Sequence, residues 1–352
     1  MKVLHFCHSF WPYYGGTGEI VGNLVLSLRK KGIEGEVVCF RKSIDGKVYE
    51  SGKIKGIKVK RLNLFNLHKV YPIAPGAVKE FFRKDIDIIH IHTTGFLADA
   101  ALLLKPFHRK KVVVSTHGGI FHTKEPIILK KIYWTFSSLT FKFCDKVVAV
   151  SKNDFDIFKK KTNKIVTIEN PISLEFKKIP KKKKNTFMCM GRISRNKRVP
   201  LLGEVFDLVG KKVFVAGNAE GENKKELEKH KSLDLLGFVG NPKRMSLYKN
   251  SEYYVSAASF EGFGLGLVEA MMASCIPIVQ PNNAFKTLLT KKEGFFVDYS
   301  KTKKAADEIK KIISMSEKKK NELRKECFNK AKTFLWKNKV NDFIKVYDEV
   351  LK

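Results

Sequence analysis

Two glutamates flank a glycine-rich segment whose composition could bind a phosphorylated ligand. Glu261 and Glu269 lie on either side of Gly262, Gly264 and Gly266, and glycines permit backbone conformations and close approaches that other residues resist. If a helix begins here, its first amides form an anion site, and the carboxylate of Glu269, one turn later, can accept hydrogen bonds from both hydroxyls of a ribose. Glu261 precedes the turn and could approach a sugar. Taken alone, the spacing favours a simpler interpretation, a glycine-rich loop with two solvated glutamates.

A second candidate segment is Met190–Lys197, which reads M-G-R-I-S-R-N-K. It follows an apolar run that is typical of a strand, so Gly191 lies at the strand end. Arg192 offers a planar fork of donors to a diphosphate, and Lys197 offers a point charge. In so lysine-rich a chain, ordinary basic surface residues are the competing interpretation. The position directly after a strand, together with the first segment, favours diphosphate binding.

A third candidate is the pair Gly15 and Gly16, which follows Trp11 and Pro12 and precedes an amphipathic segment. A lone Gly-Gly pair usually marks a turn. Its place between a first strand and a first helix favours a functional turn over a merely structural one.

Several histidines gather near strand ends. His90 and His92 alternate in I-I-H-I-H and so face one side of a strand, while His117 and His122 follow the next one. This arrangement raises the possibility of a metal site. No carboxylate or cysteine spacing supports one, so the prediction is no metal and a structural role for His90 and His92.

Apolar runs alternate with segments of helical period along the whole chain, which predicts parallel α/β sheets. In the first half, strands are expected at residues 3–7, 36–40, 86–92, 112–116 and 146–150. In the second half, they are expected at residues 187–190, 212–216, 233–236, 253–255, 276–279 and 294–297. Helices are expected at residues 20–31, 245–249, 266–273 and 336–351.

The rhythm breaks at the charged residues 177–185 (KKIPKKKKN), which are interpreted as a linker. The predicted architecture is therefore two Rossmann-like, doubly wound domains, residues 1–176 and 186–335. The final helix, about residues 336–352, carries an apolar stripe and is expected to pack back on the first domain. Ligands of such sheets bind outside the carboxyl ends of the strands, so the cleft between the domains is the expected site.

Composition restricts the partners. Lys and Arg number 68 against 35 Asp and Glu, giving a formal net charge of +33, which attracts polyanions. The sequence shows no nucleic-acid-binding module, so an anionic membrane surface is favoured over nucleic acid; generic surface lysine or a thermophilic source is the alternative.

No apolar run is long enough to span a bilayer, and no signal peptide pattern opens the chain. Six scattered cysteines are expected to be buried thiols. We expect a cytoplasmic protein, which is peripheral at the inner face of the membrane if its net charge serves membrane binding.

The segment from Ser259, S-F-E-G-F-G-L-G-L-V-E-A-M-M-A, resembles the E-x7-E signature of retaining glycosyltransferases of family four, which have the GT-B fold. Gly191–Lys197 is similar to the G-R-x-x-x-x-K element of that family, and S-T-H-G-G at His117 matches its sugar-site histidine. Two departures are Cys275, where the family commonly has glycine, and Pro281–Lys286, where it often has a G-G-x-x-E loop. The resemblance covers nearly the whole chain.

The resemblance implies roles for these residues. The implied catalytic residues are His117, Glu261, Arg192 and Lys197. The implied donor-binding residues are Gly15, Gly16, Gly191, Arg192, Lys197, Phe238, Val239, Glu261, Gly262, Phe263, Gly264, Leu265 and Glu269. No metal and no cofactor are implied beyond a nucleoside diphosphate sugar as donor.

The expected activity is retaining transfer of a hexosyl unit from a UDP- or GDP-linked sugar to a saccharide or a lipid-linked acceptor. Such a reaction belongs to the synthesis of glycans, the cell envelope, glycoproteins or glycolipids. Two alternatives stay open: another GT-B enzyme such as a nucleotide-sugar epimerase or a phosphorylase, and a non-enzymatic polyanion-binding protein. The sugar, the base, the acceptor and the oligomeric state do not follow from the sequence.

Overall fold

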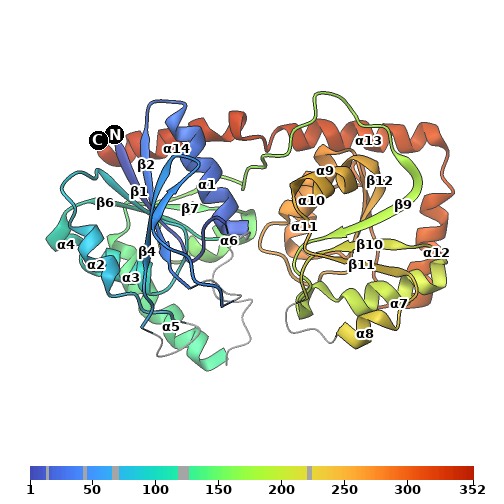
Figure 1. Cartoon of the computed structure of the whole chain (residues 1–352), viewed down its shortest axis with the longest axis horizontal. Helices are drawn as coiled ribbons and strands as arrows, with labels where there is room; N and C mark the ends of the chain where they lie inside the picture. The colour runs from blue at the N-terminus through green and yellow to red at the C-terminus, as the bar shows by residue number, and fades with distance from the viewer. Residues whose placement is uncertain (13–15, 43–45, 66–70, 118–126, 220–223) are drawn as a thin grey trace. The chain divides into compact units, whose positions relative to one another are not determined.

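The computed structural model of the chain (Figure 1) describes residues 1–12, 16–42, 46–65, 71–117, 127–219 and 224–352. The chain divides into two compact units. Unit 1 comprises Met1–Pro171 together with Trp336–Lys352, and unit 2 comprises Ile172–Leu335. Each unit is an α/β domain with one sheet, which fits the predicted architecture. The division follows Pro171, earlier than the predicted domain end at residue 176.

Unit 1 contains an eight-stranded sheet of order β3-β4-β2-β1-β5-β6-β7-β8, which is parallel except for the antiparallel edge strand β3. Its strands are β1 (Lys2–Phe6), β2 (Glu34–Phe40), β3 (Gly52–Ile54), β4 (Ile57–Leu62), β5 (Ile88–Ile91), β6 (Lys111–Ser115), β7 (Lys146–Ala149) and β8 (Ile165–Thr167). Its helices are α1 (Gly16–Arg29), α2 (Gly76–Phe81), α3 (Phe96–Leu103), α4 (Lys105–His108), α5 (Ile127–Thr140), η1 (Phe141–Phe143), α6 (Lys152–Phe158) and α14 (Trp336–Leu351).

Unit 2 contains a six-stranded parallel sheet of order β11-β10-β9-β12-β13-β14. Its strands are β9 (Lys183–Met190), β10 (Val213–Ala216), β11 (Leu233–Gly237), β12 (Ser251–Ser256), β13 (Ile276–Val279) and β14 (Phe295–Phe296). Its helices are η2 (Arg195–Lys197), α7 (Val199–Val209), α8 (Lys224–Glu228), α9 (Asn241–Asn250), α10 (Leu265–Met272), α11 (Asn283–Leu288), α12 (Thr302–Ile313) and α13 (Glu317–Lys332).

The cores explain why the strands read as continuous apolar runs. In β9, Met188 packs into a cluster with α10 and α13, whereas Phe187 and Cys189 pack into a second cluster with α7 and α12. Successive strand residues point to opposite faces, and both faces are covered by helices (Figure 1). Residues on both faces of the central strands therefore pack against helices, which favours the apolar runs that the sequence shows.

The last helix belongs to unit 1, as its apolar stripe predicts. In α14, Val340, Phe343 and Tyr347 are buried, and α14 packs against α1. Leu351, at the end of the helix, is 41% exposed. Within the described residues, no helix combines the length and the apolarity needed to cross a membrane. All six cysteines are buried free thiols, as predicted.

Some sequence-based expectations are wrong. The predicted linker is wrong for residues 183–185, which form the beginning of β9. Three short strands, β3, β4 and β8, were not predicted. In β4, Ile57 and Val59 are buried between exposed Lys58 and Lys60, a pattern with few apolar residues. Such alternation is typical of a strand near a sheet edge, and it lacks the run by which the central strands are found.

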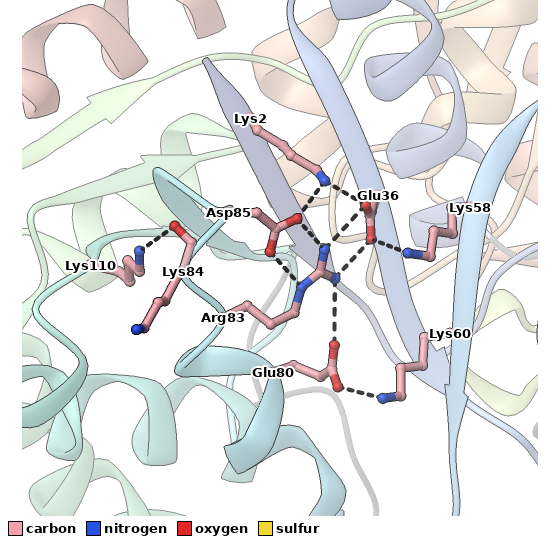
Figure 2. A network of polar contacts seen from close by, with 9 residues as sticks. All are labelled: Lys2, Glu36, Lys58, Lys60, Glu80, Arg83, Lys84, Asp85 and Lys110. Atoms are coloured by element: carbon pink, nitrogen blue, oxygen red, sulfur yellow. Dashed lines mark hydrogen bonds and ion pairs between the residues drawn. The ribbon is translucent and has the colours of Figure 1, made fainter.

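The amino ends of the central strands of unit 1 carry a network of charges (Figure 2). Glu36 on β2 accepts from Arg83 at 2.8 Å and from Lys2 on β1 at 2.8 Å. Arg83 also donates to Asp85 at 2.7 Å, and Lys2 donates to Asp85 at 2.6 Å. Glu36 is partly desolvated, yet its hydrogen bonds with Arg83 and Lys2 outweigh this and lower its pKa to about 2. The network joins the start of β1 and β2 to the segment before β5.

We expect Glu36→Gln to lower the free energy of unfolding by about 1–3 kcal/mol at pH 7, because it removes a half-buried charge that forms ion pairs with Lys2, Lys58 and Arg83. The carboxylate has a lower pKa when folded, so its contribution is present above about pH 4.5 and is lost as the pH falls towards 2. Urea titrations from pH 7 to pH 3 check this. A variant deficit that stays constant below pH 4 contradicts it, and Glu34→Gln, at an exposed position of the same strand, is the control.

Candidate donor site and histidine chain

The two chemistry-bearing segments of unit 2 meet at the carboxyl edge of its sheet. Asn196, in the turn after β9, accepts at its carbonyl oxygen from the Ser259 amide at 2.8 Å, and its side-chain amide donates to the Phe260 carbonyl at 3.0 Å. Parallel strands β9 and β12 end at the same edge, so segments 64 positions apart in sequence are joined directly. The Lys197 ammonium forms an ion pair with the Glu261 carboxylate, in which the two side chains are 18% and 13% exposed.

Two glycines let the loops after β9 and β10 approach closely. A Cβ on Gly217 would lie 1.9 Å from the carbonyl oxygen of Gly191, and Gly217 has a φ of +157°. Gly191 itself has a φ of +127° and its amide donates to Ala216. No side chain fits at this contact, so glycine at position 217 is required. The loop that carries Arg192, which is exposed, is held in place by this approach.

Helix α10 begins where the sequence predicts an anion site. Gly264 is its N-cap residue, with a φ of +102°, and a Cβ on Gly266 would lie 3.3 Å from the Met190 carbonyl oxygen. The first amides of a helix have no partner within the helix, so those of Leu265 and Gly266 are available to an anion close to the end of β9. Gly262 precedes them in the half-buried loop. The side chain of Phe263 packs on Phe334 in the core, which leaves only its backbone for a ligand.

Glu269 is held by two residues that the sequence analysis missed. Its carboxylate forms an ion pair with Arg244 and accepts a hydrogen bond from the Tyr248 hydroxyl at 2.8 Å. Both partners lie on α9, four residues apart and so on one face. The sequence signal that could have identified Arg244 and Tyr248 is their spacing of four on the helix that follows Phe238 and Val239. In the structure Phe238 is 55% exposed and Val239 is buried.

The N-terminal candidates occupy the carboxyl edge of the sheet in unit 1. Gly16 is the exposed first residue of α1, whereas Gly15 and His122 lie outside the described residues. His117 follows β6 and has a φ of +42°. A left-handed backbone is costly for a residue with a Cβ and persists only where the surroundings impose it.

His117 ends a row of three imidazoles, which we call the histidine chain: His5, His92 and His117. His5 Nδ1 lies 3.0 Å from His92 Nε2, and His92 Nδ1 lies 3.3 Å from His117 Nε2. Burial lowers the pKa of His5 to about 3 and that of His117 to about 4, and it also lowers the pKa of His92. All three rings are therefore neutral at pH 7. Because a neutral imidazole carries one N–H, both hydrogen bonds must run in the same direction.

The direction of the histidine chain follows from its buried end. Among the described residues, no partner reaches His5 Nε2. If the bonds ran towards His5, this nitrogen would carry a buried, unpaired N–H, and such orphan donors are rare and costly. In the opposite direction His5 Nδ1–H donates to His92, and His92 Nδ1–H donates to His117 Nε2. His117 then keeps its own proton on Nδ1.

The histidines also raise the question of a metal. Ligand nitrogens of His5, His90 and His92 lie within 4.8 Å of one another. His90 is committed on both sides, with Nδ1 2.7 Å from the Tyr347 hydroxyl and Nε2 2.8 Å from Ser115 Oγ. A cation would have to displace these bonds and those of the histidine chain, and the three rings bring no negative charge. The geometry fits a hydrogen-bonded cluster better than a metal centre.

Comparison with known proteins identifies the class. Two α/β units, each with its site residues at the carboxyl edge of a parallel sheet, define the GT-B fold. Solved structures share it over nearly the whole chain. HepE from Anabaena, in complex with UDP and glucose, has a TM-score of 0.75 at 15% identity, and 99% of this chain and 100% of that one are covered. Sucrose-phosphate synthase from Thermosynechococcus elongatus has a TM-score of 0.78 at 13% identity, with 99% and 98% covered.

The sequence places the chain in a family. Residues 14–176 match the profile of Glycosyltransferase Family 4, and residues 172–334 match that of Glycosyl transferases group 1. The two profiles together cover residues 14–334. The chain therefore belongs to the glycosyltransferase family that they describe, and it is a glycosyltransferase. It is 29% identical to the GDP-mannose:cellobiosyl-diphosphopolyprenol alpha-mannosyltransferase of Komagataeibacter xylinus, with 100% of this chain and 94% of the relative aligned. The protein of that name from Xanthomonas oryzae pv. oryzae is 26% identical, with 100% and 97% aligned.

We expect Gly217→Ala to destabilise unit 2 by more than about 2 kcal/mol, because its methyl group would occupy the place of the Gly191 carbonyl. Gly240→Ala is the matched control, since Gly240 has a φ of −68° and no atom of the described residues lies within 4 Å of the place that its methyl group would take. Thermal and urea unfolding of both variants test this. Equal stability of the two variants would show that the loops separate without cost.

We expect His117 to be the Nδ1–H tautomer at pH 7. Long-range proton–nitrogen NMR spectra of the imidazoles distinguish the two tautomers directly. His92→Phe keeps a ring in the cluster and removes the donor, so His117 should then show mixed tautomers. His108→Gln, which alters a histidine bound to the Ala101 carbonyl instead, should leave the His117 signals unchanged. An Nε2–H tautomer in the wild type contradicts the assigned direction.

Proposed function

We propose that the protein transfers a mannosyl unit from GDP-mannose, with retention of anomeric configuration, to a saccharide linked to a polyprenyl diphosphate. The observation that carries the donor class is the joined arrangement of Arg192, Lys197 and the first amides of α10 at one sheet edge. The relatives from Komagataeibacter and Xanthomonas, aligned over all of this chain, support the choice of sugar, base and acceptor.

The leaving group sets the electrostatic problem. Breaking the bond between sugar and diphosphate places negative charge on the diphosphate as the transition state forms. In this proposal the Arg192 guanidinium, the Lys197 ammonium and the amides of Leu265 and Gly266 stabilise that charge. Preorganised donors of this kind usually make the largest contribution to catalysis. The site supplies its cations from side chains, so the proposal requires neither a metal nor a cofactor.

The two glutamates take different parts. Lys197 is paired with Glu261 before the donor binds, so the diphosphate competes with this carboxylate for the ammonium. Glu261, once released, faces the transferred sugar. Glu269 lies one turn into α10 and holds the ribose hydroxyls, with Arg244 and Tyr248 fixing its orientation. His117 presents its Nδ1–H to a hydroxyl of the sugar. The lipid-linked acceptor implies a peripheral enzyme at the inner face of the membrane.

Turnover of a panel of nucleotide sugars tests the donor. We expect GDP-mannose to be consumed in the presence of a polyprenyl-diphosphate-linked cellobiose, and NMR of the product should show an α linkage. Arg192→Ala should lower kcat/KM by about 10²-fold, as expected for loss of one preorganised cation. Arg195→Ala is the matched control, because Arg195 is an exposed arginine in the same turn, and it should stay within about twofold of wild type.

Three outcomes would contradict the proposal. The first is that no nucleotide sugar is consumed. The second is that Arg192→Ala and Arg195→Ala behave alike. The third is that EDTA abolishes transfer, because the proposed cations are all side chains. A β-linked product would leave the donor assignment intact and overturn retention alone.

A further inference from the structure

The end of helix α5 and the turn after it expose several apolar side chains. On the buried side, the Thr140 hydroxyl donates to buried Asp99 at 2.8 Å, and Ser137 is also buried. Three apolar residues of this segment face outward. Phe136, Leu139 and Phe143 are 43%, 58% and 45% exposed. We call these three the apolar stripe, because positions three and four apart lie on one face of a helix.

A second exposed apolar group lies beside the end of the stripe. Phe107 on α4 is 73% exposed, and Leu103 at the end of α3 is 46% exposed. The Lys105 ammonium donates to the Phe143 carbonyl at 2.8 Å, which joins α4 to η1. Single exposed apolar side chains are common, but several on adjoining elements form a patch, and such patches mark interaction surfaces.

Cations surround this patch. A shallow hollow is lined by Lys105, Pro106, Arg109, Lys142, Phe143 and Lys164. Asp145 lies here as well, and it pairs with Lys105 at 2.6 Å. Arg109, Lys142 and Lys164 are exposed. Apolar side chains bordered by lysine and arginine are the composition by which a helix lies in the interface of an anionic bilayer.

We propose that the face formed by α4, η1 and the apolar stripe of α5 docks on an anionic lipid bilayer. A second copy of the chain fits this face poorly, since a symmetric contact would bring two basic rims together in a molecule of net charge +33. Lipid phosphates match the rim, and the apolar stripe reaches the acyl boundary.

The direction of α5 suits a lipid-linked acceptor. The helix connects β6 to β7, which are parallel neighbours, so it runs from the carboxyl edge of the sheet to the amino edge. The face, at the end of α5, therefore lies towards the amino edge, and α5 connects it to the carboxyl edge where His117 follows β6. This part of the argument rests on the proposed function, whereas the charge and exposure of the face do not.

Vesicle binding tests the apolar part. We expect the wild type to bind vesicles of equal parts phosphatidylglycerol and phosphatidylcholine at low salt. Phe107→Ser combined with Leu139→Gln should lower the partition coefficient about tenfold, because it removes exposed apolar surface that the bilayer would cover. Ile179→Gln with Leu208→Gln is the matched control: both are exposed apolar residues of unit 2, 40% and 47% exposed, and should change nothing. Circular dichroism checks that all variants are folded.

A second pair of variants tests the charge. Lys142→Gln with Lys164→Gln should lower binding to anionic vesicles roughly tenfold, since each cation near such a surface contributes measurably. Lys303→Gln with Lys310→Gln changes the net charge equally, at exposed positions of α12, and should have little effect. Vesicles of phosphatidylcholine alone should bind the wild type weakly.

Each outcome decides between the two proposals. If the wild type does not bind anionic vesicles, the proposed docking face is wrong. The same holds if a test variant and its matched control bind the vesicles equally well. In either case, mannosyl transfer to a soluble cellobiose derivative still tests the proposed function. If the wild type binds vesicles through this face but consumes no nucleotide sugar, the function is wrong and the face stands. A dimer in sedimentation that Phe107→Ser with Leu139→Gln dissociates would make a second copy the occupant and overturn the lipid proposal.

Discussion

The contact between Gly217 and the Gly191 carbonyl is the constraint on which the candidate donor site of unit 2 depends. It sets how closely the loop after β9 approaches the end of β10. With that loop in place, Asn196 can reach the segment at Ser259, and Lys197 can reach Glu261. Gly266 in turn brings α10 within van der Waals contact of the end of β9. Close contacts between backbone segments thus position the charged groups, and these contacts are possible because the residues at them are glycines.

Unit 1 achieves precision by different means. Its candidate residue His117 is hydrogen-bonded to a polar row that leads back to buried His5 on the central strand β1. Burial keeps these rings neutral, and neutrality is what makes the direction of their hydrogen bonds informative. Charged imidazoles would repel one another. A protonated imidazole also carries a proton on both nitrogens, so a charged row could not fix the tautomer of His117. The burial of this row is therefore what fixes the tautomer of His117.

The central strands and the helix at residues 336–351 could be predicted from the sequence because each must be apolar on a face that meets other elements. The edge strands β3 and β8 could not, since each is paired on one side only, and β4, next to the edge, alternates apolar with charged residues instead of forming an apolar run. The spacing of Glu261 and Glu269 and the Arg192 to Lys197 element located the candidate site. Its internal pairing did not follow from the sequence: Arg244 and Tyr248 reach Glu269 from another helix, through contacts that depend on tertiary packing.

The ion pairs of unit 2 bear on how a donor could be selected. Glu261 forms an ion pair with Lys197, and Glu269 forms one with Arg244. The negative charge of each carboxylate is therefore already balanced by a side-chain cation. A diphosphate that took Lys197 would therefore exchange one ion pair for another, and the net gain from charge would be small because the released carboxylate must be solvated or bound again. Only a ligand that also offers hydroxyls to Glu261 and Glu269 avoids this cost. Under the proposed function, free diphosphate or a nucleotide without its sugar would leave part of this exchange uncompensated, so selectivity for the complete nucleotide sugar would come from the carboxylates as much as from the cations.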